Sequence, residues 1–261
     1  MSVETVLITG ASAGIGRELA ACFAADRSRL VLVARRKREL ESLAEELRER
    51  YKTQSEVIVG DLSQPTTPTR LFEHLRNNGS KVDVLVNNAG FGAYGQFAEL
   101  DERRQLDMAQ VNIVALTHLT RLFLPGMIAR KRGGVLNVAS TASFQGGPGM
   151  AVYYASKAYV LSFSEAISEE TAGTGVVVTA LCPGATATEF PQASGMKNSK
   201  LFERASMSAA VVARIGHRAF RKGRFVVVAG LPNKLMSFST RLVPRAAARK
   251  VAAYLNNSKH G

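Results

Sequence analysis

Seven short apolar runs, separated by stretches with helical spacing, constrain the fold of this chain more than any other feature. The runs are dominated by Val, Leu and Ile and lack the polar alternation of a half-exposed strand. They therefore indicate strands buried on both faces, as in a parallel sheet covered by helices. The runs lie at residues 3–9, 30–34, 57–59, 82–86, 135–139, 176–181 and 225–229.

Helical spacing predicts the elements between these runs, at residues 15–25, 37–50, 71–75 and 100–130. Strands that alternate with helices predict a doubly wound α/β fold, with a seven-stranded parallel sheet and helices on both faces. No linker, repeat or low-complexity segment divides the 261 residues, so we expect one domain.

The turn after the first predicted strand is rich in glycine, in the spacing GxxxGxG. Glycines let the backbone turn tightly and approach a pyrophosphate, which then binds at the N-terminus of the following helix. A purely structural turn is the alternative, but the position between a strand and a helix favours phosphate binding. The candidate residues are Gly10, Ser12, Ala13, Gly14, Ile15 and Gly16.

The end of the second predicted strand carries Arg35 and Arg36, and no acid precedes Glu39. An acid at this place would accept hydrogen bonds from the ribose 2′-hydroxyl of NAD(H). Guanidinium groups can instead pair with a 2′-phosphate, so the sequence predicts NADP(H) in preference to NAD(H). A solvated charge run is the alternative, although cations at a helix start oppose the helix dipole.

Tyr153 and Lys157 are spaced i, i+4, so they share one face of a helix. A nearby ammonium favours the phenolate, which would lower the pKa of Tyr153 from its reference value of about 10 and make it a general acid/base. Tyr154 is the poorer candidate because Ala158 stands four residues on. This spacing is common by chance, so by itself it would not indicate catalysis.

Further polar or glycine-containing motifs follow four other predicted strands. Asp61 and Leu62 follow the third strand, Ser140 the fifth, and the segments 87–90 and 182–184 follow the fourth and sixth. The carboxyl ends of parallel strands lie at one edge of the sheet, where open α/β folds bind ligands. We therefore expect these motifs to converge on one cleft.

Taken together, the motifs TGxxxGIG, NNAG, a helical Asn, Ser, YxxxK and PGxxxT resemble the short-chain dehydrogenases/reductases, in their single-domain, NADP(H)-preferring branch. The resemblance covers about residues 3–230 and implies a Rossmann fold. It implies that Asp61 lies by the adenine, Asn88 near the adenosine ribose, and the PGxxxT segment by the nicotinamide. The cofactor-binding residues so implied, beyond those of the glycine turn and the two arginines, are Asp61, Leu62, Asn88, Ala89, Gly90, Tyr153, Lys157, Pro183, Gly184, Thr186 and Thr188.

The resemblance also implies a mechanism in which NADPH delivers hydride to a carbonyl carbon. Tyr153 would give its proton to the developing alkoxide, and Ser140 would orient the carbonyl oxygen. Lys157 would hold the nicotinamide ribose and lower the pKa of Tyr153, while Asn112 would hold a water in a proton relay. No metal is expected, because Cys22 and Cys182 lack the spacing of metal ligands.

Two segments are expected to set substrate specificity in this fold, residues 141–152 and 189–207. They suit an apolar ketone, aldehyde or secondary alcohol, although core packing explains the same side chains equally well. A 3-oxoacyl-thioester reductase is the alternative enzyme, and a non-catalytic NADP(H)-binding sensor or scaffold is the alternative from another class. The apolar residues concerned are Phe144, Met150, Val152, Phe190, Met196, Leu201 and Phe202.

The net charge of +13 is confined to the last quarter of the chain. Residues 197–261 hold 14 of the 34 Lys and Arg residues and one of the 21 acids, which leaves 20 of each in residues 1–196. Beyond the predicted domain at 1–230, apolar spacing predicts two amphipathic basic helices in the extension 231–261, broken at Pro244. The apolar residues lie at Leu231, Leu235, Phe238, Leu242, Ala248, Val251 and Leu255.

Three uses of this extension remain open: packing on the core, a subunit contact, or contact with an anionic membrane, acidic carrier protein or CoA thioester. Nucleic acid is not expected, because no aromatic platform interleaves the basic residues. The segment 1–4 has no basic or long apolar character, and no apolar run approaches the ~20 residues that span a bilayer. We therefore expect a cytoplasmic protein whose extension is a candidate peripheral membrane contact. The resemblance implies a homodimer or homotetramer, commonly formed through long helices that include residues 153–171.

Overall fold

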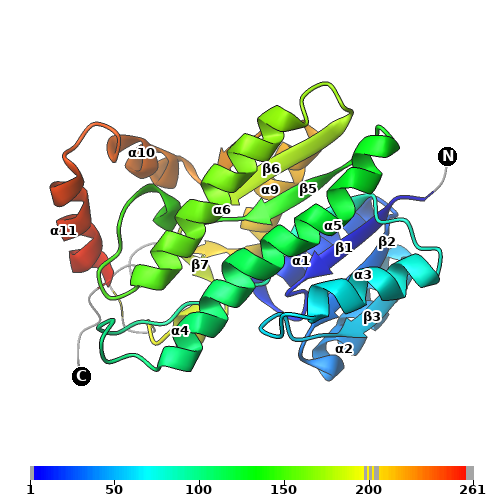
Figure 1. The fold of residues 1–261 in the computed structure, drawn as a ribbon, viewed down its shortest axis with the longest axis horizontal. Coiled ribbons are helices and arrows are strands. Elements are labelled where there is room, and N and C mark those ends of the chain that lie inside the picture. Colours follow the sequence, from blue (N-terminus) through cyan, green and yellow to red (C-terminus); the bar gives the residue numbers. More distant parts are fainter. Residues whose placement is uncertain (1–2, 197–198, 200–201, 203–205, 257–261) are drawn as a thin grey trace.

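The computed structural model describes all residues except 1–2, 197–198, 200–201, 203–205 and 257–261. Its centre is a seven-stranded sheet in which every neighbouring pair is parallel, in the order β3-β2-β1-β4-β5-β6-β9 (Figure 1). This confirms the predicted sheet. The strands are β1 (Thr5–Thr9), β2 (Arg29–Ala34), β3 (Ser55–Val59), β4 (Val84–Asn87), β5 (Gly133–Val138), β6 (Val176–Cys182) and β9 (Val226–Val228).

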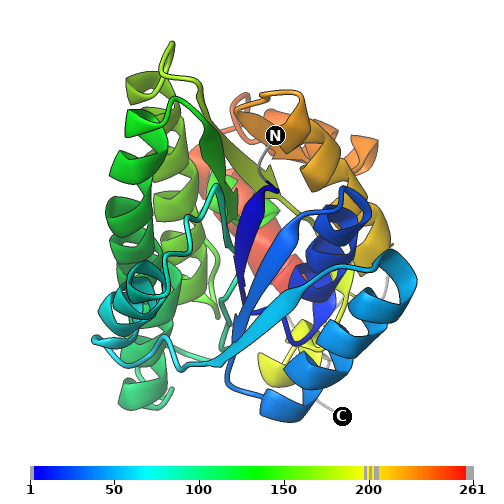
Figure 2. The same ribbon diagram turned by 90° about the vertical axis from the view of Figure 1, so that its right-hand side faces the viewer.

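Helices cover both faces of the sheet, as predicted (Figure 2). One layer holds α1 (Gly14–Ala25), α2 (Lys37–Tyr51) and α9 (Ala209–Arg221). The opposite layer holds α3 (Thr67–Asn77), α5 (Leu116–Ala129) and α6 (Ala151–Glu170). The smaller elements are α4 (Glu102–Ala109), η1 (Gln110–Ala115), η2 (Thr141–Phe144), α7 (Phe190–Ala193), the paired strands β7 (Thr186–Ala187) and β8 (Met207–Ser208), α10 (Leu231–Ser239) and α11 (Arg245–Asn256).

Successive residues of β1 pack into opposite layers, which explains why the strands contain no polar alternation. Val6 and Ile8 join the core under α1 and α2, whereas Leu7 joins the core under α3 and α5. Each of the three is fully buried. Because both faces are apolar, polar and glycine-rich motifs are left for the ends of the strands.

The long helical stretch predicted at residues 100–130 consists of α4, the π-helical segment η1 and α5. By length and composition it is also apolar enough to cross a membrane, with a mean hydropathy of 1.4 over 18 residues, against the sequence-based expectation. In the structure Leu119, Phe123 and Met127 pack into the core against the sheet. A core helix passes the same test, so this composition is weak evidence for a membrane span.

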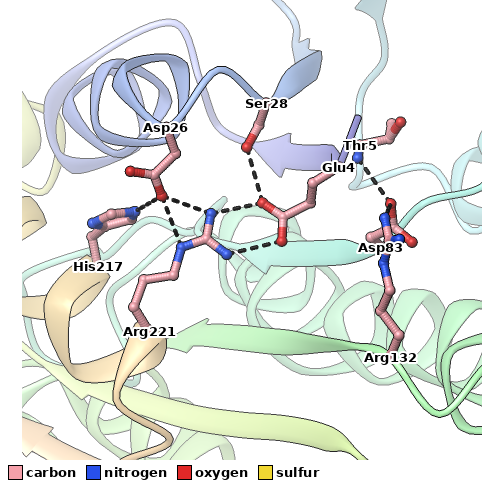
Figure 3. Close-up of polar contacts among 8 residues, drawn as sticks. All are labelled: Glu4, Thr5, Asp26, Ser28, Asp83, Arg132, His217 and Arg221. Atoms are coloured by element: carbon pink, nitrogen blue, oxygen red, sulfur yellow. Dashed lines mark hydrogen bonds and ion pairs between the residues drawn. The ribbon is translucent and has the colours of Figure 1, made fainter. Parts of the chain in front are cut away.

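A charged cluster joins α9 to the residues just before β1 and β2, at the amino ends of these strands (Figure 3). Arg221 donates to both carboxylate oxygens of Glu4, at 2.8 and 2.6 Å, and to Asp26 at 2.8 Å. His217 lies 2.9 Å from the same Asp26 oxygen, and Ser28 donates to Glu4 at 2.9 Å. Burial raises the pKa of Glu4, but the hydrogen bond and charge of Arg221 outweigh it and hold the pKa below its usual 4.5.

We expect Arg221→Met to lower the free energy of unfolding by about 1–2 kcal/mol near neutral pH, because it leaves Glu4 and Asp26 without their common partner. A lowered folded pKa stabilises the protein above the unfolded pKa, and that stability is lost as the pH falls through the folded pKa. Denaturant unfolding should therefore show the variant and the wild type converging in acid. Arg48→Met is the control, since its pair with Glu45 is exposed and should contribute little. An equal loss in both variants would contradict this account.

Candidate active site

A cavity of about 720 Å³ opens at the carboxyl ends of the strands, with lining residues that directly follow β1 to β6. The predicted convergence of motifs on one cleft is therefore confirmed. All predicted site residues line this cavity except Gly16 and Asn112. Those that do are Gly10, Ser12, Ala13, Gly14, Ile15, Arg35, Arg36, Asp61, Leu62, Asn88, Ala89, Gly90, Ser140, Tyr153, Lys157, Pro183, Gly184, Thr186 and Thr188.

Hydrogen bonds from the Asn88 side chain support the glycine-rich turn between β1 and α1. The Asn88 amide donates to the carbonyl oxygens of Thr9 and Gly10, at 3.0 and 3.1 Å. A Cβ at Gly16 would lie 2.3 Å from this amide nitrogen and 2.4 Å from the Gly10 oxygen. Gly16 therefore permits close packing beneath the turn without facing the cavity, and Asn88 supports the turn as well as lining the cleft.

The N-terminus of α1 fits the phosphate groups of a dinucleotide. Its N-cap residue Ala13 makes no side-chain cap, and its first turn contains no acid. The first N–H groups of a helix have no partner within the helix and attract anions. Ser12, Gly14 and Ile15 bring this end into the cavity lining, so the backbone here can receive a pyrophosphate.

The two arginines lie beside this turn, at the end of β2. Arg36 donates to the Ser12 hydroxyl at 3.2 and 3.3 Å, and its Nη1 lies 3.0 Å from a carboxylate oxygen of Glu189. Arg35 is exposed at the same rim of the cavity. At the end of β3, Asp61 accepts from the Ser63 amide at 2.9 Å and faces the same region.

Tyr153 and Ser140 form the polar centre of the cavity. Both side chains line the cavity, and the Ser140 hydroxyl lies close enough to the phenol to lower its pKa. The Ala142 amide donates to Ser140 Oγ at 3.1 Å, which fixes the serine at the start of η2. Tyr154 also lines the cavity, but its hydroxyl donates to Asn256 at 2.9 Å. Its hydroxyl is therefore engaged with α11, and the catalytic role of Tyr153 stays a prediction.

The expected fall in the Tyr153 pKa is wrong for this structure. Burial raises the pKa of Tyr153 to about 12, and the hydrogen bond from Ser140 offsets only part of that effect. Lys157 Nζ lies 5.9 Å from the Tyr153 ring centroid and donates to the Val138 carbonyl at 2.7 Å. Burial also lowers the pKa of Lys157 to about 8. An ammonium with this pKa is still mostly protonated at neutral pH, but it binds the Val138 carbonyl and its charge does not contribute to the Tyr153 shift, so burial decides the direction of that shift.

Asn112 is buried behind the cavity, in the π-helical segment η1. Its amide nitrogen donates to the Phe91 carbonyl and to Ser156 Oγ, both at 3.0 Å, and its oxygen accepts from the Phe91 amide at 3.1 Å. These bonds hold α6 against the segment that follows β4. The side chain therefore positions α6, and the water relay stays a prediction.

Residues 4–199, more than half of the chain, match the short chain dehydrogenase family. The chain belongs to this family. A short-chain dehydrogenase from Sphingobium yanoikuyae, solved in complex with NADPH, is 30% identical with a TM-score of 0.82, over 92% of this chain and 93% of that one. The match extends to the fold as a whole, including the seven-stranded sheet.

Two curated relatives differ in what their names say of activity. The very-long-chain 3-oxoacyl-CoA reductase of Anas platyrhynchos is 33% identical over 72% of this chain and 61% of its own length. The inactive hydroxysteroid dehydrogenase-like protein 1 of Homo sapiens is 34% identical over 70% of this chain and 56% of its own length. This short-chain dehydrogenase thus spans less than two thirds of either relative.

The far end of the cavity in this short-chain dehydrogenase is apolar. Of the predicted specificity residues, Met150, Phe190, Met196 and Phe202 line it. Phe144 and Val152 do not, because Phe144 packs on the core around Val160 and Val152 lines a separate small pocket. Leu201 lies outside the described residues.

Sequence reasoning missed the last wall of the cavity, which α10, α11 and the turn between them supply. The apolar spacing of these helices was visible in the sequence, but it did not reveal which surface they cover. The two helices lie together at one end of the molecule (Figure 1). The lining residues from this region are Met236, Ser239, Thr240, Val243, Ala247, Ala248, Val251, Ala252 and Leu255.

Asn256 connects α11 to the start of α6 and to the segment before it through two hydrogen bonds. It is buried, accepts from the Tyr154 hydroxyl at 2.9 Å and donates to the Pro148 carbonyl at 3.1 Å. We expect Asn256→Ala to raise the substrate KM roughly tenfold, about 1.4 kcal/mol, because the wall formed by α11 loses these bonds. The Kd of the cofactor should stay unchanged, since the glycine turn is at the other end of the cavity.

A double-mutant cycle with Tyr154→Phe isolates the contribution of the Asn256–Tyr154 bond from other effects of the substitution. Steady-state kinetics of the four proteins should show non-additive changes in KM. Strict additivity, or a KM unchanged in Asn256→Ala, would show that the bond does not position the wall.

Proposed function

We propose that this chain transfers hydride between NADP(H) and a carbonyl or secondary alcohol group of an apolar substrate. One observation carries the proposal: Tyr153 and Ser140 line the same cavity as the glycine-rich turn and the uncapped N-terminus of α1. The nicotinamide, when bound, supplies or accepts the hydride. The remaining tasks of binding, orientation and proton transfer fall to residues of this chain.

The protonation states support Tyr153 as a proton donor. A phenol whose pKa is about 12 stays protonated at neutral pH, so it can hydrogen-bond a substrate oxygen and then protonate it. Ser140 can donate a second hydrogen bond to the same oxygen and orient the carbonyl. Lys157, with a pKa of about 8, changes protonation readily near neutral pH and can exchange protons with the site.

The preference for NADP(H) is supported by the rim of the cavity. Arg36 already contacts Ser12 of the phosphate-binding turn, and Arg35 follows β2 at the same edge. A 2′-phosphate in this place would meet two guanidinium groups, which bind phosphate oxygens through charge-assisted hydrogen bonds.

A 3-oxoacyl-thioester reductase is the second candidate, favoured by the name of the Anas platyrhynchos relative and by the basic C-terminal residues. A non-catalytic NADP(H)-binding sensor or scaffold is the third, as the name of the human relative illustrates. The presence of Ser140, Tyr153 and Lys157 in one cavity argues against this third candidate, since a sensor needs no proton donor.

A screen of NADPH oxidation across apolar ketones, aldehydes and 3-oxoacyl thioesters separates these three candidates. Turnover of ketones or aldehydes alone supports the first, and preferred turnover of thioesters supports the second. Cofactor binding without turnover of any class would contradict both enzymatic candidates and support the third.

We also propose a homodimer or homotetramer and a cytoplasmic location. Exposed apolar side chains on α4, η1 and α6, namely Leu106, Val114 and Tyr159, support a subunit contact along the long helices. Cys22 and Cys182 are free thiols, as expected in a reducing compartment. Light scattering measures the molar mass and so tests the oligomeric state, and cell fractionation tests the cytoplasmic location.

A further inference from the structure

The C-terminal helix α10 presents an apolar face to solvent. Leu231, Leu235 and Phe238 recur at helical spacing and are 69%, 62% and 56% exposed, and Leu242 just beyond the helix is 73% exposed. Ser237, on the packed side of the same helix, is buried. An exposed face of this kind, on neighbouring turns of one helix, is typical of an interaction surface and not of scattered surface residues.

The charges around this face have one sign. Residues 231–256 contain five basic side chains and no Asp or Glu. All five are exposed, and within the described residues none lies within 4 Å of a carboxylate. They are Lys234, Arg241, Arg245, Arg249 and Lys250.

The apolar cavity reaches this same surface. Met236, Val243 and Val251 line the cavity and are also 36%, 43% and 57% exposed. These side chains therefore stand at a mouth of the cavity, beside the exposed face of α10. A molecule that covered α10 and the turn at Pro244 would lie directly against this mouth.

We propose that α10, α11 and the turn between them dock on an anionic lipid bilayer, from which a lipophilic substrate enters the cavity. Apolar side chains bordered by unpaired cations match the interface of such a bilayer, where acyl chains lie beneath anionic headgroups. The docking part of this proposal, binding of the bilayer, is inferred from the exposed face and its charges alone. The delivery part, entry of the substrate from the bilayer, rests on the proposed function.

Two other occupants fit these observations less well. In a two-fold contact with a second copy of this chain, the same surface faces itself, so the five cations would oppose one another without an acid between them. An acidic carrier protein would match the charges, but it would leave the row of Leu231, Leu235 and Phe238 without an apolar partner. A bilayer accounts for both features.

Cosedimentation with vesicles tests the docking part on the full chain. Wild-type protein should bind vesicles of phosphatidylcholine with about one-third phosphatidylserine, and bind phosphatidylcholine vesicles much less. Leu235→Glu with Phe238→Glu should lower the bound fraction at least about tenfold, and Lys234→Glu with Arg241→Glu should also lower it. Phe97→Glu is the matched control, because Phe97 is 64% exposed outside this surface and should leave binding unchanged.

The substituted side chains are exposed, so thermal unfolding should match the wild type and exclude misfolding as the cause. Failure of the wild type to bind anionic vesicles would overturn the proposal, as would equal binding by the Leu235→Glu, Phe238→Glu variant. A fall in molar mass by light scattering with unchanged vesicle binding would also overturn it, in favour of a second copy of the chain.

The delivery part is tested by comparing a long-chain ketone held in vesicles with a short ketone in buffer. The Leu235→Glu, Phe238→Glu variant should raise the KM for the vesicle-borne ketone roughly tenfold and leave the short ketone unaffected, since neither residue lines the cavity. An equal KM for the vesicle-borne ketone overturns delivery. Vesicle binding by a protein that turns over neither ketone overturns the proposed function and leaves docking intact.

Discussion

Replacing Tyr153 by Phe should lower kcat by about 10²–10⁴-fold, the range typical of a lost general acid/base. The phenol lines the cavity beside Ser140, and burial keeps it protonated with a pKa of about 12. Phe keeps the ring and its packing 5.2 Å from the Phe190 ring, so the shape of the site is preserved. Single-turnover oxidation of NADPH measures the loss directly.

Cofactor binding separates a chemical role from a structural one. NADPH affinity, measured by fluorescence titration, should change by less than about threefold in Tyr153→Phe, because the phosphate-binding turn is untouched. Tyr154→Phe is the matched control: its hydroxyl binds Asn256 and not the catalytic centre, so kcat should stay close to the wild type. Full activity in Tyr153→Phe would refute the assignment, and so would an equal loss of kcat in both variants.

The sheet and the edge that carries the site could be predicted because both follow from local pattern. Continuous apolar runs such as residues 30–34 can be buried only between two helical layers, and parallel strands bring their carboxyl ends together. The order of motifs along the chain therefore determined which residues meet. Gly16 and Asn112 were the exceptions, since spacing alone cannot tell a residue that lines a cavity from one that packs behind it.

The sign of the Tyr153 pKa shift could not be predicted, because it depends on a balance between charge and burial. The i, i+4 spacing places Lys157 near the phenol, but it does not reveal that Nζ binds the Val138 carbonyl or that both groups are desolvated. The wall formed by α11 was hidden for a related reason. Helical spacing identifies an apolar face, whereas the Asn256–Tyr154 contact joins residues 102 positions apart and exists only in the folded chain.

Replacing both Arg35 and Arg36 by Ala should weaken NADPH binding about 100-fold and leave NADH binding within about threefold of the wild type. Each charge-assisted hydrogen bond to a phosphate contributes about 1.5–3 kcal/mol, and 1.4 kcal/mol is a factor of ten in Kd. NADH lacks the 2′-phosphate, so it makes no such contact with the two arginines and its affinity should not depend on them. Titration of each protein with NADPH and with NADH gives the ratio of the variant Kd to the wild-type Kd for both cofactors.

Neighbouring charges supply the controls for this result. Arg38→Ala removes an exposed cation at the start of α2, just after the two arginines, that does not line the cavity, so it should affect both cofactors little. Glu189 lies 3.0 Å from Arg36 and competes for it, so Glu189→Gln should tighten NADPH binding without changing NADH binding. If the double arginine variant weakens both cofactors equally, the arginines act on the shared pyrophosphate region or on the fold, and the preference for NADP(H) has another origin.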